Sequence, residues 1–173
     1  MNLGDFAGQD EIFVDANIFT YFALGTTAYQ ESCAEFLMRI EQGQVHAVTS
    51  DFVLNEVMYA LLVGKGSELL ASTRIARIKK HLMQDAALSA ACYKVCQDFW
   101  DYLTVLQATG LQVVSVSNRE QEASLELGGR YLLLPTDALH LATCYHHAIR
   151  HLATADAHFE EVDLVQVWTP TKR

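Results

Sequence analysis

Short apolar runs recur along the chain, separated by longer segments in which apolar residues return every three to four positions. A short apolar run bounded by polar residues is typical of a strand buried in a sheet. Four such runs and one weaker run at the edge predict strands at residues 12–14, 45–50, 111–117, 151–156 and 164–168.

The intervening segments have the 3.6-residue spacing of amphipathic helices. They predict helices over residues 29–43, 52–63, 67–85, 86–110, 118–129 and 136–149, with a break at Gly64 to Gly66. Strands that alternate with helices indicate a parallel α/β fold. A chain of 173 residues fits one domain, so we expect a single domain over 1–173 with an extended helical segment at about 66–110.

Four carboxylates each follow a short apolar run of the kind that is typical of a buried strand. Asp15 ends the first strand, Glu56 lies in the second turn of the helix after the second, Asp137 opens a late helix, and Asp156 follows the fourth strand. The carboxyl ends of parallel strands share one rim of the sheet, where ligands bind. Carboxylates crowded there need protons or divalent cations to neutralise them. The spacing therefore predicts a Mg²⁺ or Mn²⁺ site and metal-assisted phosphodiester hydrolysis.

Each acid also has a purely structural interpretation. Asp15 could cap a turn, Glu56 could face solvent, and Asp137 and Asp156 could serve helix N-termini.

Polar neighbours of the acids could orient the metal ligands, as metal sites commonly require. Asn17 could bond Asp15 or the loop backbone, and Thr154 could orient Asp156 or contact substrate. Thr136 directly precedes Asp137 and is expected to cap that helix.

A histidine also follows one of the acids along a predicted helix. His140 is three residues after Asp137, so the two can share a helix face. Its apolar surroundings, LHLATCY, are more typical of a core residue than of a ligand.

Net charge changes the expected mode of substrate binding. The chain has 12 Lys and Arg against 21 Asp and Glu, a net charge of −9, whereas affinity for a polyanion comes mainly from basic residues. Arg74, Arg77 and Lys80 run along one face of a predicted helix and could track a phosphate backbone, although such a strip taken alone is more typical of a solvated helix face. Arg130 could reach a phosphate at the rim, and Lys172 and Arg173 form a basic tail.

The surroundings in which the chain works follow from its composition. No apolar stretch reaches the ~18 residues of a membrane span, and the start MNLGDFAGQDE is acidic where a signal peptide is basic. We therefore expect a cytoplasmic protein with no membrane partner. The four cysteines, in apolar helical contexts without a CxxC pair, are predicted to be buried free thiols: Cys33, Cys92, Cys96 and Cys144.

Taken together, strand-D-x-N at Asp15 and Asn17, Glu56 after the second strand, TDALHLA from Thr136, and T-x-D-x-x-F from Thr154 resemble the PIN-domain family. Within it the chain is most similar to VapC-type toxins, the ribonuclease members of toxin–antitoxin pairs. The resemblance covers nearly the whole chain and implies a three-layer α/β/α fold with a central, mainly parallel sheet.

The resemblance also implies an activity and its partners. The four acids would be both the catalytic and the metal-binding residues of an Mg²⁺- or Mn²⁺-dependent endoribonuclease, with RNA as substrate and an antitoxin protein as partner. Two departures stand out: Ala16 replaces the Thr or Ser of many relatives, and the helical stretch from about 66 to 110 is long.

Three other functions stay open. A haloacid dehalogenase-type phosphatase also begins with an Asp after its first strand, but it places a second Asp where this chain has Asn17. A catalytically inactive PIN-like module for protein interaction would suit the acidic surface and the long helical segment. DNA cleavage by a related nuclease fold is the third.

We also expect a homodimer. The predicted helical segment contains Tyr93, Phe99, Trp100 and Tyr102, an aromatic set that could form an interface or an ordinary core.

Overall fold

The computed structural model describes residues 1–26 and 28–172, so Arg173 of the basic tail lies outside the described residues. Its centre is a sheet of five parallel strands in the order β3-β2-β1-β4-β5. The strands are β1 Ile12–Val14, β2 Ala47–Ser50, β3 Leu111–Val114, β4 His151–Ala153 and β5 Gln166–Trp168. The central β1 has a neighbour on each side, as expected of a strand that is apolar at every position.

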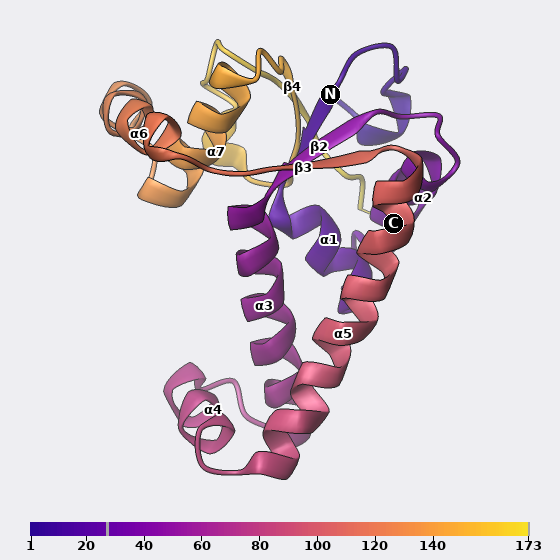
Figure 1. Ribbon diagram of the computed structural model, residues 1–173, viewed down its shortest axis with the longest axis vertical. Coiled ribbons are helices and arrows are strands. Elements are labelled where there is room, and N and C mark those ends of the chain that lie inside the picture. The colour runs from indigo at the N-terminus through magenta and orange to yellow at the C-terminus, as the bar shows by residue number, and fades with distance from the viewer. Residues whose placement is uncertain (27, 173) are drawn as a thin grey trace.

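Helices cover both faces of this sheet and give the predicted three-layer architecture (Figure 1). Their bounds are η1 Leu3–Asp5, α1 Ala16–Ala23, α2 Gln30–Glu41, α3 Asp51–Leu70, α4 Ile75–Leu82, α5 Ala86–Thr109, α6 Asn118–Tyr131, α7 Pro135–His146 and η2 Ala157–Phe159. Helices α6 and α7 pack on each other on one side, whereas α1, α2, α3 and α5 pack together on the other.

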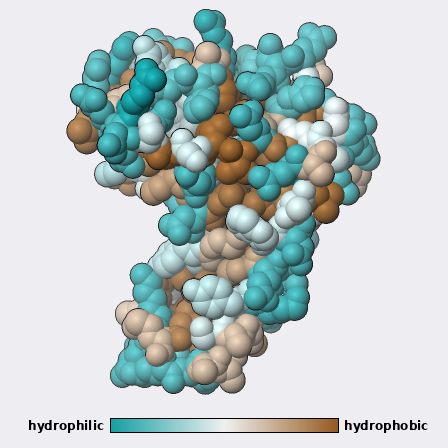
Figure 2. All heavy atoms as spheres, in the orientation of Figure 1, coloured by the Kyte–Doolittle hydropathy of each residue, from teal (hydrophilic) through white to brown (hydrophobic). Residues whose placement is uncertain are grey.

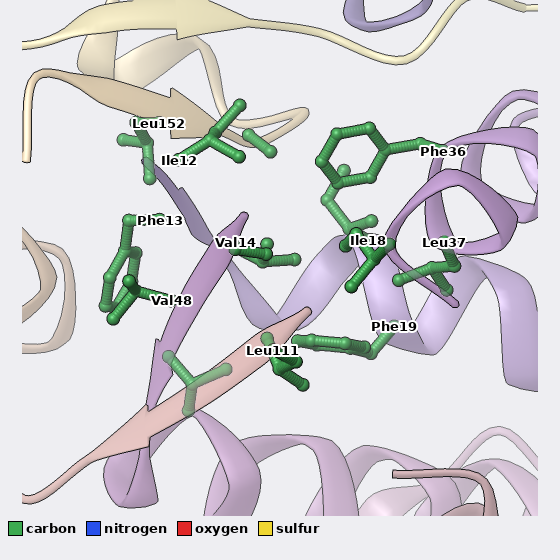
Figure 3. Close-up of a cluster of buried hydrophobic side chains, with 14 of the residues drawn as sticks. Ile12, Phe13, Val14, Ile18, Phe19, Phe36, Leu37, Val48, Leu111 and Leu152 are labelled. Atoms are coloured by element: carbon green, nitrogen blue, oxygen red, sulfur yellow. The ribbon is translucent and has the colours of Figure 1, made fainter. Parts of the chain in front are cut away.

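Alternate residues of β1 fill the two halves of the core (Figure 3). Phe13 is paired in register with Val48 and Leu152 on the neighbouring strands, and its ring lies 5.9 Å from that of His140 in α7. Val14 points to the opposite side, toward Ile18 in α1. The core therefore holds the end of β1 rigidly between two helical layers.

Helices α3 and α5 extend beyond the sheet as an arm with α4 at its far end (Figure 1). The expected break at Gly64 to Gly66 is wrong, because α3 continues through both glycines to Leu70. Their missing side chains make room for close packing. A Cβ at Gly64 would lie 2.8 Å from a methyl of Leu24, and one at Gly66 would lie 2.7 Å from a methyl of Ile78.

Buried positions follow the apolar pattern of the sequence, except that part of the expected aromatic surface of α5 belongs to the core. The four cysteines are free and buried, and burial raises the pKa of the Cys33 thiol to about 12. In α5 the expected aromatic surface is half core: Phe99 packs edge-on against Phe19, and Tyr102 packs against Phe22. Only Tyr93 and Trp100 of that set are exposed.

In the described part of the chain no helix is both long and apolar enough to cross a membrane.

This division predicts different costs for two neighbouring substitutions. Phe99→Ala is expected to lower the free energy of unfolding by about 3–5 kcal/mol, because it opens a cavity beside Phe19. Trp100→Ala, at a 52% exposed position, is expected to change it by no more than about 0.5 kcal/mol. Urea unfolding of the two variants measures the difference, and equal losses would contradict the assignment of Phe99 to the core.

Candidate active site and metal centre

Four local structures bring the predicted acids to the carboxyl rim of the sheet. Asp15 follows β1 and caps α1, where its Oδ1 accepts from the Ala16 amide at 2.6 Å. Asp156 lies just beyond β4 and caps η2. Glu56 lies in the second turn of α3, directly after β2, and Asp137 lies in the first turn of α7.

The Asp15 carboxylate is held by side chains from two strand ends. Asn17 Nδ2 and Thr154 Oγ1 both donate to its Oδ2, Thr154 at 2.6 Å. The Asn17 Oδ1 accepts from the Ala155 amide at 3.0 Å, which ties the loop after β1 to the loop after β4. Thr154 therefore orients Asp15, while its oxygen also accepts from the Asp156 amide at 3.0 Å.

His140 lies between two of the acids. Its Nε2 is 2.8 Å from Glu56 Oε2 and 3.7 Å from Asp15 Oδ1. The geometry at Glu56 Oε2 is that of an ion-pair contact rather than a well-aligned hydrogen bond, and His140 Nδ1 has no hydrogen-bond partner among the described residues. His140 is only 2% exposed, so it is buried as the sequence suggested, yet it also joins the acid cluster.

The surrounding charges set the protonation of His140. Burial disfavours its positive form, but the Glu56 contact and the charges of Asp15 and Asp137 outweigh burial and raise the pKa of His140 above its ordinary value. The imidazolium form partly neutralises the two carboxylates that it contacts.

Two of the acids form a second group with a histidine. Asp137, Asp156 and His158 each present a ligand atom, and these atoms lie within 4.8 Å of one another. His158 Nδ1 is 3.2 Å from Asp156 Oδ1 and 3.7 Å from Asp137 Oδ2. The sequence interpretation missed His158, although its place two residues after Asp156 puts it in the same loop.

Electrostatics link the two groups into one cluster. Burial raises the pKa of the Asp15 carboxyl, and Glu56 adds to the shift against the opposing effects of His140 and Thr154. Burial also raises the pKa of Asp137, with further increases from Asp156 and Asp15. Neighbouring carboxyl groups whose pKa values are raised are suited to binding a divalent cation. The charge of the cation stabilises their ionised forms, and hard cations prefer oxygen ligands.

The exposed fraction of the acidic side chains increases across the cluster from Asp15 to Asp156. The exposed side-chain fractions are 10% for Asp15, 16% for Asp137, 30% for Glu56 and 34% for Asp156. The acids thus form a half-buried rim that solvent reaches. A surface concavity of about 740 Å³ lies elsewhere, at the opposite end of β4 around Arg150 and His151.

The remaining predicted site residues lie outside this cluster. Thr136 does not cap α7, because the helix already begins at Pro135 and its N-cap residue Leu134 makes no side-chain cap bond. The Arg130 guanidinium lies over the Tyr131 ring at the end of α6. The basic strip is exposed on or next to α4 at the far end of the arm, and it consists of Arg74, Arg77 and Lys80.

The family model for the PIN domain matches residues 12–165, and the parallel sheet between two helical layers agrees with this match. The chain belongs to the PIN-domain family. Two curated relatives come from Methanocaldococcus jannaschii. Ribonuclease VapC2 is 22% identical over 92% of this chain and 93% of its own length. Ribonuclease VapC6 is 45% identical over 42 residues, which span 24% of this chain and 28% of that relative.

Solved structures share the fold at low sequence identity. Mycobacterium tuberculosis VapC20, described as a Sarcin-Ricin loop cleaving toxin, aligns with a TM-score of 0.57 and 17% identity over 91% of this chain and 98% of that one. A toxin–antitoxin complex from Klebsiella pneumoniae gives a TM-score of 0.56 and 18% identity over 90% of this chain and 95% of that one. These likenesses establish the fold.

The raised pKa of Asp137 predicts that Asp137→Asn increases the melting temperature in EDTA. An acid whose pKa is raised by folding costs folding free energy once it is ionised. The parent is therefore expected to lose stability as the pH rises from 3.8, the ordinary pKa, through the raised value, and the variant should lack this loss. Thermal melts from about pH 3.5 to pH 8 cover the interval.

Asp101→Asn provides the control, because Asp101 is exposed on α5, away from the rim. It should melt like the parent throughout. An Asp137→Asn variant that melts below the parent at every pH would show that this carboxylate stabilises the metal-free fold.

Proposed function

We propose that this protein is a metal-dependent endoribonuclease that cleaves RNA phosphodiester bonds with Mg²⁺ or Mn²⁺. The observation that carries the proposal is the gathering of Asp15, Glu56, Asp137 and Asp156 at one half-buried rim, with pKa values raised for its two least exposed acids. Such a rim is costly for the metal-free fold, so a role in binding a cation accounts for it better than a structural role.

Each side chain has a separate part in this proposal. Asp137, Asp156 and His158 already converge within the span of one coordination shell, and Asp15 and Glu56 would complete the binding of one or two ions from the other side of the rim. A bound divalent cation supplies Lewis-acid stabilisation of the negative charge that develops on the phosphate. Asn17 and Thr154 hold the Asp15 carboxylate in place.

His140 has a positioning role in the same mechanism. Its Nε2 atom contacts the carboxylates of both Glu56 and Asp15, so a protonated His140 would partly neutralise these two acids in the absence of a cation. The buried imidazole also fixes the distance between α3 and the end of β1. Metal sites depend on such neighbouring groups to hold the metal-binding side chains in place.

An RNA substrate is supported by the relatives and by local charge. VapC2 is named a ribonuclease, and VapC20 is described as a Sarcin-Ricin loop cleaving toxin. Arg130 at the end of α6 and the strip of Arg74, Arg77 and Lys80 at the far end of the arm supply positive charge for phosphate contacts on an otherwise acidic chain. If the strip binds RNA, replacing its three residues with Gln should weaken the salt dependence of RNA affinity. The slope of log affinity against log salt concentration should become shallower by about 0.7 for each phosphate contact that is lost.

Partners belong to the same proposal. Structural neighbours that are toxin–antitoxin complexes support an antitoxin protein as partner, and an RNA substrate would place the activity in the cytoplasm. For the homodimer, α6 and the loop after it offer better contacts than the buried Phe99. Leu125, Leu132 and Leu134 are 80%, 92% and 65% exposed there, and such apolar surface is typical of an interface.

The alternatives have less support. The match to the PIN family leaves the phosphatase without a family argument. An inactive interaction module would not need four acids whose crowding costs stability.

Purified protein, freed of any partner, is expected to cleave single-stranded RNA with Mg²⁺ or Mn²⁺ and to stop in EDTA. Glu56→Gln should lower the rate by more than about 100-fold, because it removes a charge from the cation site. Glu68→Gln is a matched control on the same helix, where Glu68 only pairs with Lys65. Cleavage that continues in excess chelator, or equal rates for the two variants, would refute the metal mechanism.

A further inference from the structure

The face of α3 that carries Glu56 continues with an exposed aromatic ring. Tyr59 is three residues further on, so the two side chains are neighbours on the helix surface. Long side chains on a helix lean toward its N-terminus, which brings the Tyr59 ring back over the turn that holds Glu56. The ring is 45% exposed, and no hydrogen bond of the Tyr59 hydroxyl occurs within the described part of the chain.

A cation from α4 lies over this ring. The Lys79 ammonium is 4.9 Å from the ring centre of Tyr59, and within residues 1–26 and 28–172 no acidic side chain forms an ion pair with it. The position of Lys79 follows from the packing of α4, because its neighbour Ile78 is buried against Gly66 of α3. The contact with Tyr59 is therefore not needed to hold α4 on the arm.

Local charge around this pair is opposite to that of the whole protein. Residues 69–84 contain four basic side chains and no Asp or Glu, whereas the chain carries a net charge of −9. Figure 2 shows hydrophilic side chains along the lower edge of the molecule, next to neutral and weakly apolar ones, where α4 lies in Figure 1. Positive charge for an RNA phosphate is therefore available beside Tyr59, which shares helix α3 with Glu56.

We propose that Tyr59 and Lys79 form a subsite for single-stranded RNA, in which a base stacks on the ring and Lys79 contacts the adjoining phosphate. This inference rests on the proposed ribonuclease function and extends it to a substrate-positioning surface. An exposed aromatic ring beside a cation is the combination by which proteins bind single strands. Its place one helical turn from Glu56 would put the bound nucleotide next to the one that is cleaved.

The test measures binding of a fluorescent, mixed-sequence single-stranded RNA of about 12 nucleotides in EDTA, and cleavage of the same RNA in Mg²⁺. Tyr59→Leu should weaken binding about tenfold, a value within the range for loss of one base stack. Tyr59→Phe keeps the ring and should stay within about twofold of the parent. In the cleavage assay Tyr59→Leu should raise KM more than it lowers kcat.

Two further variants separate RNA contact from structural effects. Tyr93→Leu is the matched control, since Tyr93 is 54% exposed on α5, and it should bind RNA like the parent. Lys79→Gln should reduce the log–log salt dependence of binding by about 0.7, a change that a mere contact between α3 and α4 would not produce. Melting temperatures of all variants identify any loss of fold.

The outcomes are distinct. If the parent neither binds nor cleaves RNA, the proposed function fails and the subsite with it. If the parent does both, and Tyr59→Leu and Lys79→Gln bind RNA as it does, only the subsite is overturned, and the exposed pair is left to a protein partner. If Tyr59→Leu misfolds, an unchanged salt dependence in Lys79→Gln still overturns the proposal.

Discussion

The burial of the Asp15 carboxylate is the constraint on which the site depends. The Asp15 side chain is only 10% exposed at the end of the central strand, and an uncompensated charge there would be costly. Asn17, Thr154 and His140 surround it, and they come from α1, the end of β4 and α7. Stabilising one carboxylate therefore fixes the relative positions of three segments that are far apart in the sequence.

That constraint also explains how the other acids are placed. His140 reaches from Asp15 to Glu56, and Thr154 joins Asp15 to the loop that carries Asp156 and His158. The network thus spans both groups of acids at the rim. A bound cation would reduce the electrostatic repulsion within both groups at once. Helix α3 of the arm begins at the same rim, directly after β2, whereas α5 ends at the amino-terminal side of the strands, just before β3. The exposed face of α3 therefore continues the surface on which a long substrate would lie.

Much of this arrangement could be predicted from the sequence, because burial controls it. The strands, their parallel arrangement and the places of Asp15, Glu56 and Asp156 after β1, β2 and β4 follow from apolar runs and from the common rim of a parallel sheet. Asp137 differs, because the helix in which it lies, α7, follows α6 rather than a strand. The course of α3 through Gly64 and Gly66 could not be predicted, since helix propensity argues for a break and only tertiary packing of Leu24 and Ile78 explains its continuation. The contacts of His140 were likewise hidden, because an apolar sequence context does not reveal which acids lie across the core.

The most direct test of a cation site at this rim is a crystal structure of the protein with Mn²⁺, located by its anomalous scattering. The account predicts a peak within about 2.0–2.3 Å of carboxylate oxygens from Asp137 and Asp156, close to Asp15. No peak at the rim at millimolar Mn²⁺, with the four acids in their present positions, would contradict it.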